Sequence, residues 1–149
     1  SAQIRRREER DGWLASLVLS TGTFAYAVGA VVLIIFQAMP FISDLQAKEP
    51  EIILGIGSLA NVGFALFLLV AVPFLLSSGW ATLTTGVLPR WFGYGSFVLA
   101  LASFGASLGA LMTTPTWLAA GGLATSFGFL SFFSWTFVLA ILQLKSPNN

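Results

Sequence analysis

The stretch TTGVLPRWFGYG, residues 84–95, contains Arg90, the only charged side chain between Glu51 and Lys145. Long apolar segments lie on both sides of this arginine, and each is longer than a membrane span. A single basic residue between two such segments indicates a short loop at a membrane surface, where a guanidinium can reach lipid phosphates beside an indole such as Trp91. We therefore predict that two membrane-spanning helices are joined at this loop.

The composition extends this interpretation to the whole chain. Of the 149 residues, 56% are hydrophobic and only 9% are charged, and the mean hydropathy is +0.87. Charge-free segments at 12–43, 52–89 and 91–144 each exceed the roughly 20 residues that cross a bilayer as a helix, and the last is long enough to cross twice. Pro115 disfavours helix at Thr114 and divides that last segment. The sequence predicts an all-α, polytopic transmembrane helical bundle with four helices, at about 13–37, 52–78, 91–112 and 117–143.

The charged residues predict the topology of this bundle. Six basic residues flank the predicted spans on one side, and only Lys48 lies on the other. By the positive-inside rule, both termini and the Arg90 loop are expected in the cytoplasm. The chain then divides into a charged cytoplasmic segment at 1–12, helical but breaking at Asp11–Gly12, and a four-helix transmembrane domain at 13–149. The residues that we interpret as topology anchors are Arg5, Arg6, Arg7, Arg90 and Trp91.

Arg90 also has a second interpretation. In that alternative it binds a partner or an anionic lipid headgroup specifically.

Missing residue types limit the chemistry that the chain can perform. The sequence has no histidine and no cysteine, and the predicted spans contain no charged side chain. Imidazole or thiolate ligation, intramembrane proton carriers and a Schiff-base lysine are therefore excluded within this chain. We expect no catalytic residue, no metal and no cofactor, and thus no enzyme. Asn61 lies inside the second span, where it needs a hydrogen-bond partner from another helix or from a polar substrate.

Small residues indicate where helices approach each other closely. The segment GASLG places Gly105 and Gly109 four residues apart, a spacing that lets two backbones meet in a membrane. We expect the third span to make the closest helix–helix contact in the structure here, either within the chain or with a partner. Gly22, Gly29 and Gly121 are the corresponding candidates in the first and fourth spans. Pro73 interrupts the second span and is expected to kink it.

The stretch TTGVLPRWFGYGSFVLAL, residues 84–101, resembles a loop and helix found in a family of uncharacterised bacterial, largely actinobacterial, integral membrane proteins. The matching residues run from Thr85 to Trp91 and include Gly93, with Phe92 in place of a leucine. The upstream segment LANVGFALFLLVAVPFLL, residues 59–76, resembles the preceding helix of that family. The resemblance implies a polytopic membrane fold and no known activity. It also implies that this chain corresponds to the last four spans of a six-span protein, the alternative being a complete four-helix protein.

These features lead to two hypotheses about function. The first is a non-catalytic accessory or structural subunit of a larger membrane protein complex, located as a multi-pass protein in a bacterial cytoplasmic membrane. The second is a transporter or channel component for a small apolar or weakly polar molecule, with Asn61 and the Pro73 kink lining its path. In either case the expected partners are membrane lipids and other membrane protein subunits, or further copies of the chain, and not nucleic acid.

Overall fold

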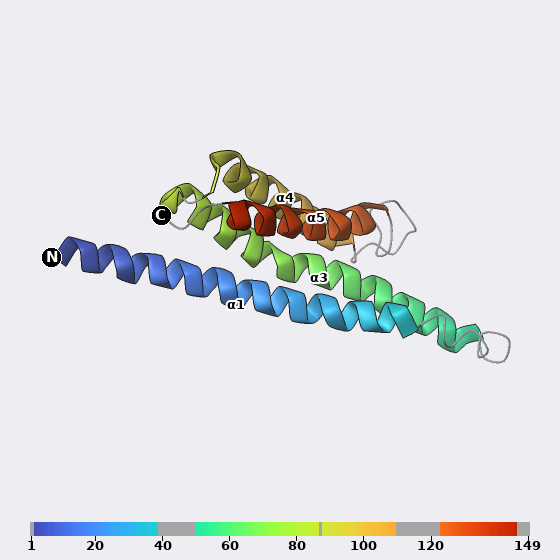
Figure 1. Ribbon diagram of the computed structural model, residues 1–149. Helices are drawn as coiled ribbons and strands as arrows, with labels where there is room; N and C mark the ends of the chain where they lie inside the picture. The colour runs from blue at the N-terminus through green and yellow to red at the C-terminus, as the bar shows by residue number, and fades with distance from the viewer. Residues whose placement is uncertain (1, 39–49, 87, 110–122, 146–149) are drawn as a thin grey trace.

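The computed structural model describes the backbone of residues 2–38, 50–86, 88–109 and 123–145. These residues form the helices α1 (Ala2–Ala38), α3 (Pro50–Thr85), α4 (Arg90–Leu108) and α5 (Leu123–Lys145), shown in Figure 1. The all-helical architecture agrees with the sequence prediction. Three of these helices, α1, α3 and α4, are long and apolar enough to cross a membrane, whereas the apolar part of α5, Ser126–Leu142, is shorter.

Two helices extend beyond their predicted boundaries. α1 continues without interruption from the charged segment into the apolar one, so the predicted break at Asp11–Gly12 is wrong. A single glycine lowers helix stability by only about 1 kcal/mol relative to alanine and does not force a break. α3 continues seven residues past the predicted end at 78, to Thr85. The residues 110–112 and 117–122 of the predicted third and fourth spans lie outside the described residues.

Hydroxyl groups in the last turns of α3 are satisfied without interrupting the helix. Thr82 Oγ1 donates to the carbonyl of Ser78 at 2.8 Å, and Thr84 Oγ1 donates to the carbonyl of Trp80 at 2.9 Å. A threonine bonded to the preceding turn in this way is compatible with an apolar environment. This local bonding explains how the polar segment at 77–85 stays helical.

The Arg90 loop is a tight reversal between α3 and α4. Gly86 adopts φ 68°, and its N–H donates to the carbonyl of Thr82 at 3.1 Å. Glycine reaches this left-handed conformation without the steric cost of a side chain, so it ends the helix. Pro89 then precedes α4 with φ −57° and ψ 138°, and its carbonyl accepts the N–H of Phe92 at 2.9 Å. The connection is short, so α3 and α4 are antiparallel neighbours.

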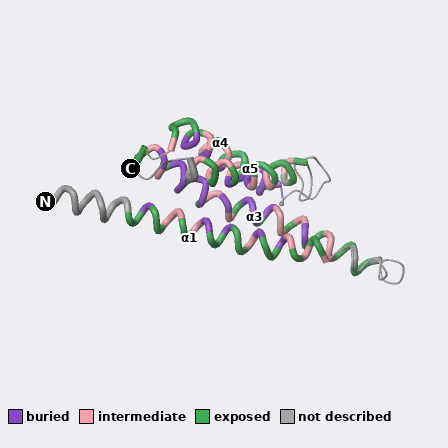
Figure 2. The backbone as a smooth tube through the Cα atoms, in the orientation of Figure 1, coloured by how far each residue is buried: buried purple, intermediate pink, exposed green. Residues whose placement is uncertain are grey.

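α3 is the central helix of the bundle and packs against α1, α4 and α5, while α4 and α5 also pack against each other. Figure 1 shows α1 running alongside α3, with the start of α1, the α3–α4 connection and the end of α5 at the same end of the molecule. The buried residues follow the inner faces of the helices, as Figure 2 shows. The centre of the core is aromatic, with Phe67 and Phe132 meeting edge to face at 5.1 Å between ring centroids.

Candidate functional site

The closest backbone approach that we identify between two helices is at Gly79 of α3 and Gly93 of α4. A Cβ atom added to Gly79 would lie 3.0 Å from the carbonyl oxygen of Gly93, and one added to Gly93 would lie 3.2 Å from that of Gly79. Each glycine therefore faces the backbone of the other, a geometry that brings Cα–H groups close to carbonyl oxygens. This pair was not predicted as a contact. A signal was present, because both glycines lie seven positions from Gly86, where the chain reverses.

Gly22 and Gly29 lie where α1 packs on α3. A Cβ on Gly22 would lie 3.0 Å from the ring of Phe74, and a Cβ on Gly29 would lie 2.7 Å from the ring of Phe67. These glycines thus receive phenylalanine rings rather than another backbone. Their contacts connect α1 to the aromatic core of α3.

Gly105 makes no close helix contact within the described residues, so the prediction of such a contact inside the chain is wrong. Gly105 is exposed, and a Cβ added there meets no atom within 4 Å. Gly109 is buried and follows the last residue of α4, and Gly121 lies outside the described residues. The face of α4 that packs inward does not include Gly105. Its buried residues are Phe92, Gly93, Ser96, Ala100, Ser103, Ala106 and Ser107.

A tryptophan connects α5 to α4. The part-buried Trp135 indole N–H donates to Ser96 Oγ at 2.9 Å, and its ring stacks on Phe92 with centroids 4.8 Å apart. The ring lies directly against Gly95, where any side chain would collide with it. Trp135 is therefore a packing residue between helices.

α1 and α3 are joined by a pair of hydroxyl groups. Thr21 Oγ1 and Ser77 Oγ lie 3.2 Å apart. Thr21 Oγ1 is also 2.7 Å from the carbonyl of Leu17, and Ser77 Oγ is 3.0 Å from the carbonyl of Phe74. Since each hydroxyl carries one hydrogen, the three contacts cannot all be hydrogen bonds at once. The interhelical bond therefore competes with bonds inside each helix.

Asn61 and Pro73 do not share a groove. Asn61 is part-exposed, and its amide makes no hydrogen bond with any other residue that the structure describes. Pro73 is exposed and lines shallow grooves with residues near Thr21 and Phe24 of α1. The two residues are twelve positions apart on one helix, or about 18 Å along its axis. Neither described groove that Pro73 lines includes Asn61.

The proposed anchors Arg90 and Trp91 begin α4 and are exposed. Trp91 also contacts Trp135 edge to face, with ring centroids 5.9 Å apart. Arg5, Arg6 and Arg7 belong to the first turns of α1, but their side chains lie outside the described part of the structure. The rings of Trp91 and Trp135 therefore lie together at the end of the bundle where α4 starts.

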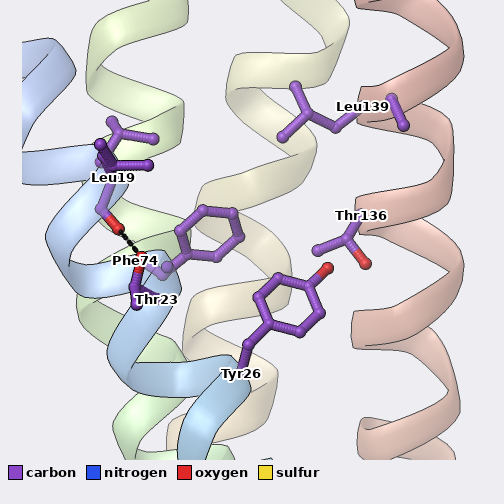
Figure 3. Close-up of a pocket in the computed structure, with 9 residues that line it drawn as sticks. Leu19, Thr23, Tyr26, Phe74, Thr136 and Leu139 are labelled. Carbon is purple, nitrogen blue, oxygen red and sulfur yellow. Dashed lines mark hydrogen bonds between the residues drawn. The ribbon is translucent and has the colours of Figure 1, made fainter.

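An open groove lies between α1 and α5, with α3 as its floor; we call it the α1–α5 groove. Its inner part has a volume of about 450 Å³ and includes Thr23, Tyr26, Phe74 and Thr136. Figure 3 shows the Tyr26 hydroxyl directed toward Thr136 across this space. Leu139 lines both this part and the outer part.

The outer part of the α1–α5 groove has a volume of about 400 Å³ and reaches the Arg90 end of the bundle. Leu14 of α1, Thr82 of α3 and Leu88 of the connection line it. Val18 and Leu19 are shared with the inner part, so the two parts adjoin. The groove thus runs from the α3–α4 connection to Tyr26, whose ring contacts Phe132 and Phe133 and closes its inner end.

The groove offers hydroxyl groups and apolar surface for binding. Thr23 donates to the carbonyl of Leu19 at 2.8 Å, and Thr136 donates to that of Phe133 at 2.9 Å, so both hydroxyls are already satisfied. Among the residues that the structure describes, no three His, Cys, Asp or Glu side chains come together as a metal site. The groove is therefore suited to an apolar occupant.

Comparison of the chain with protein-family models, with curated proteins and with solved structures found no match.

Proposed function

We propose that this chain is a non-catalytic integral membrane protein that acts as an accessory or structural subunit of a larger membrane assembly. The observation that carries the proposal is the outward face of α4. Gly105 is open on this face beside the exposed Ala102, and the large side chains of Leu101 and Leu108 flank the gap. A small-residue gap between leucines is the shape that receives a second helix in a membrane.

Most other glycines in the apolar parts of the helices differ from Gly105, because they contact another helix. Gly22, Gly29, Gly63, Gly79, Gly93, Gly95 and Gly128 each contact a side chain or backbone of another helix. Within the apolar parts of the described helices, Gly12, Gly55 and Gly105 have no such contact. Gly12 and Gly55 lie near the starts of the apolar parts of α1 and α3, whereas Gly105 lies on a helix whose opposite face is buried. The geometry around Gly105 therefore favours a contact with another protein or another copy of the chain.

We further propose that all four helices cross a bacterial cytoplasmic membrane with both termini in the cytoplasm. The placement of the start of α1, the Arg90 loop and the end of α5 at one end of the bundle supports an even number of crossings. The excess of basic residues in these three segments supports the orientation. The bacterial location is supported by the resemblance of residues 84–101 to bacterial membrane proteins.

The rival hypothesis, a transporter or channel component, has less support. It relied on Asn61 and Pro73 lining one path, and neither described groove that Pro73 lines includes Asn61. The α1–α5 groove is open along its side rather than enclosed by helices. Its geometry suits an occupant that enters from the lipid, as considered below.

Copurification from native membranes tests the subunit proposal. Gly105→Leu fills the gap on α4 and is expected to remove a stoichiometric partner, or to convert a homo-oligomer into monomers, without lowering the melting temperature of the isolated chain. Gly55→Leu is the matched control, because it also adds a leucine at an exposed glycine without contacts. An assembly that survives Gly105→Leu unchanged would remove the basis of the proposal.

A further inference from the structure

We propose that the α1–α5 groove binds one acyl chain of an anionic phospholipid, with the headgroup at the Arg90 end of the bundle. This inference requires the membrane location but not the subunit function, because it concerns a surface other than the outward face of α4.

The dimensions of the groove fit one lipid chain. Along α1, the groove extends from Leu14 to Tyr26, which is twelve positions or about 18 Å of helix. One leaflet of a bilayer contributes about 15 Å of hydrocarbon, half of the roughly 30 Å core. The closed inner end at Tyr26 and the open outer end at Leu88 therefore lie about one leaflet apart. A groove of this depth matches the reach of an acyl chain that starts at the membrane surface.

The lining of the groove is apolar over most of this length. Val18, Leu19 and Leu139 form its middle section. The hydroxyls of Thr23 and Thr136 are already bonded within their own helices, so they need no hydrogen bond from the occupant. Phospholipid chains surround every such groove in a bilayer, and an empty groove would forfeit dispersion contacts along its walls. The apolar lining thus accounts for the acyl chain but not for any preference among headgroups.

The charge at the open end supplies that preference. Arg90 is exposed two residues after Leu88, which lines the outer part of the groove. A basic residue next to an opening between membrane helices favours an anionic headgroup.

Lipid binding to the purified full-length chain, measured by native mass spectrometry, tests the inference. We expect one phosphatidylglycerol to be retained per chain, in preference to phosphatidylcholine with the same acyl chains. Arg90→Gln should keep a bound lipid but reduce the preference for phosphatidylglycerol about fivefold, since one basic residue near a charged surface contributes about that factor.

Two groove variants test the position of the acyl chain. Ala140 is exposed in the inner part of the groove, so Ala140→Phe should fill it and abolish retention of the lipid. Ala30 is exposed on α1 and does not line the groove, so Ala30→Phe is the matched control and should retain the lipid. Thr23→Phe, at another exposed lining position, provides a second filling variant if Ala140→Phe does not fold.

Several outcomes would overturn the inference. Equal retention of the two lipids by the unmodified chain would contradict the proposed headgroup site. Undiminished retention by a folded groove variant would contradict the proposed acyl-chain site. A lipid that binds the isolated chain but is absent from an assembly purified with its partner would show that a protein helix occupies the groove. Each of these results leaves the Gly105→Leu experiment unaffected, so the failure of either proposal is recognised separately.

Discussion

Gly79 and Gly93 face each other across the α3–α4 interface, and each lies against the carbonyl oxygen of the other, with added Cβ atoms at 3.0 and 3.2 Å from those oxygens. Backbone atoms cannot move aside as a flexible side chain can, so this contact leaves no room for a larger residue. It fixes the distance between α3 and α4 immediately before and after their tight connection. The pair is therefore a requirement for the close packing of α3 against α4 on either side of the reversal at Gly86.

We expect Gly79→Leu to lower the melting temperature of the isolated chain in detergent. The side chain would force α3 and α4 apart, and overpacking of this kind costs about 1–3 kcal/mol. Gly105→Leu serves as the control, because the same side chain there meets open space. A Gly79→Leu protein with the same melting temperature as the unmodified chain would show that the two helices are not closely packed in solution.

Two buried serines of α4 should respond in opposite directions to alanine. Ser96 Oγ accepts the indole N–H of Trp135, so Ser96→Ala leaves that donor unpaired and should destabilise the chain by about 1–3 kcal/mol. Ser103 is fully buried, and its hydroxyl has no hydrogen-bond partner among the residues that the structure describes. Ser103→Ala should therefore be neutral or stabilising. Thermal unfolding of both variants makes the comparison, and equal destabilisation by the two substitutions would contradict it.

The Thr21–Ser77 contact should contribute little to stability despite its position between α1 and α3. Because both hydroxyls have a carbonyl partner in their own helix, removal of one hydroxyl leaves the other satisfied. A double-mutant cycle with Thr21→Val and Ser77→Ala is expected to give a coupling energy of about 0.6 kcal/mol or less. Thr23→Val with Ser58→Ala is a control cycle, since each hydroxyl there bonds only within its own helix, and should give none. A coupling several times larger would mean that the interhelical bond dominates.

Cysteine labelling tests the proposed topology, because the chain has no cysteine of its own. Glu51 and Thr84 are both exposed and lie near opposite ends of α3. In intact cells, an impermeant maleimide should label Glu51→Cys and should label Thr84→Cys only after the membrane is opened. The reverse pattern would place the Arg90 loop outside the cytoplasm.

The contrast between Gly105 and Gly79 shows how far sequence reasoning reaches for the candidate sites. The GASLG spacing correctly identifies residues that are small enough for a close contact, but spacing along one helix does not reveal what lies opposite. Phe92, Ser96 and Ala100 are buried on the inward face of α4, and this rotation of the helix leaves Gly105 outward. The α1–α5 groove was likewise beyond prediction, since it is lined by residues from three helices that only packing brings together.

The sequence by itself determined the all-helical class, the apolar character of the long helices and the reversal at Arg90. These properties depend on segment composition and on local backbone preferences, which act over a few residues and do not need a partner. The tertiary structure alone decided which glycines meet another helix, where Trp135 packs and where a groove remains open. Those features depend on the relative rotation and spacing of helices, which are fixed by side-chain packing between residues far apart in the chain.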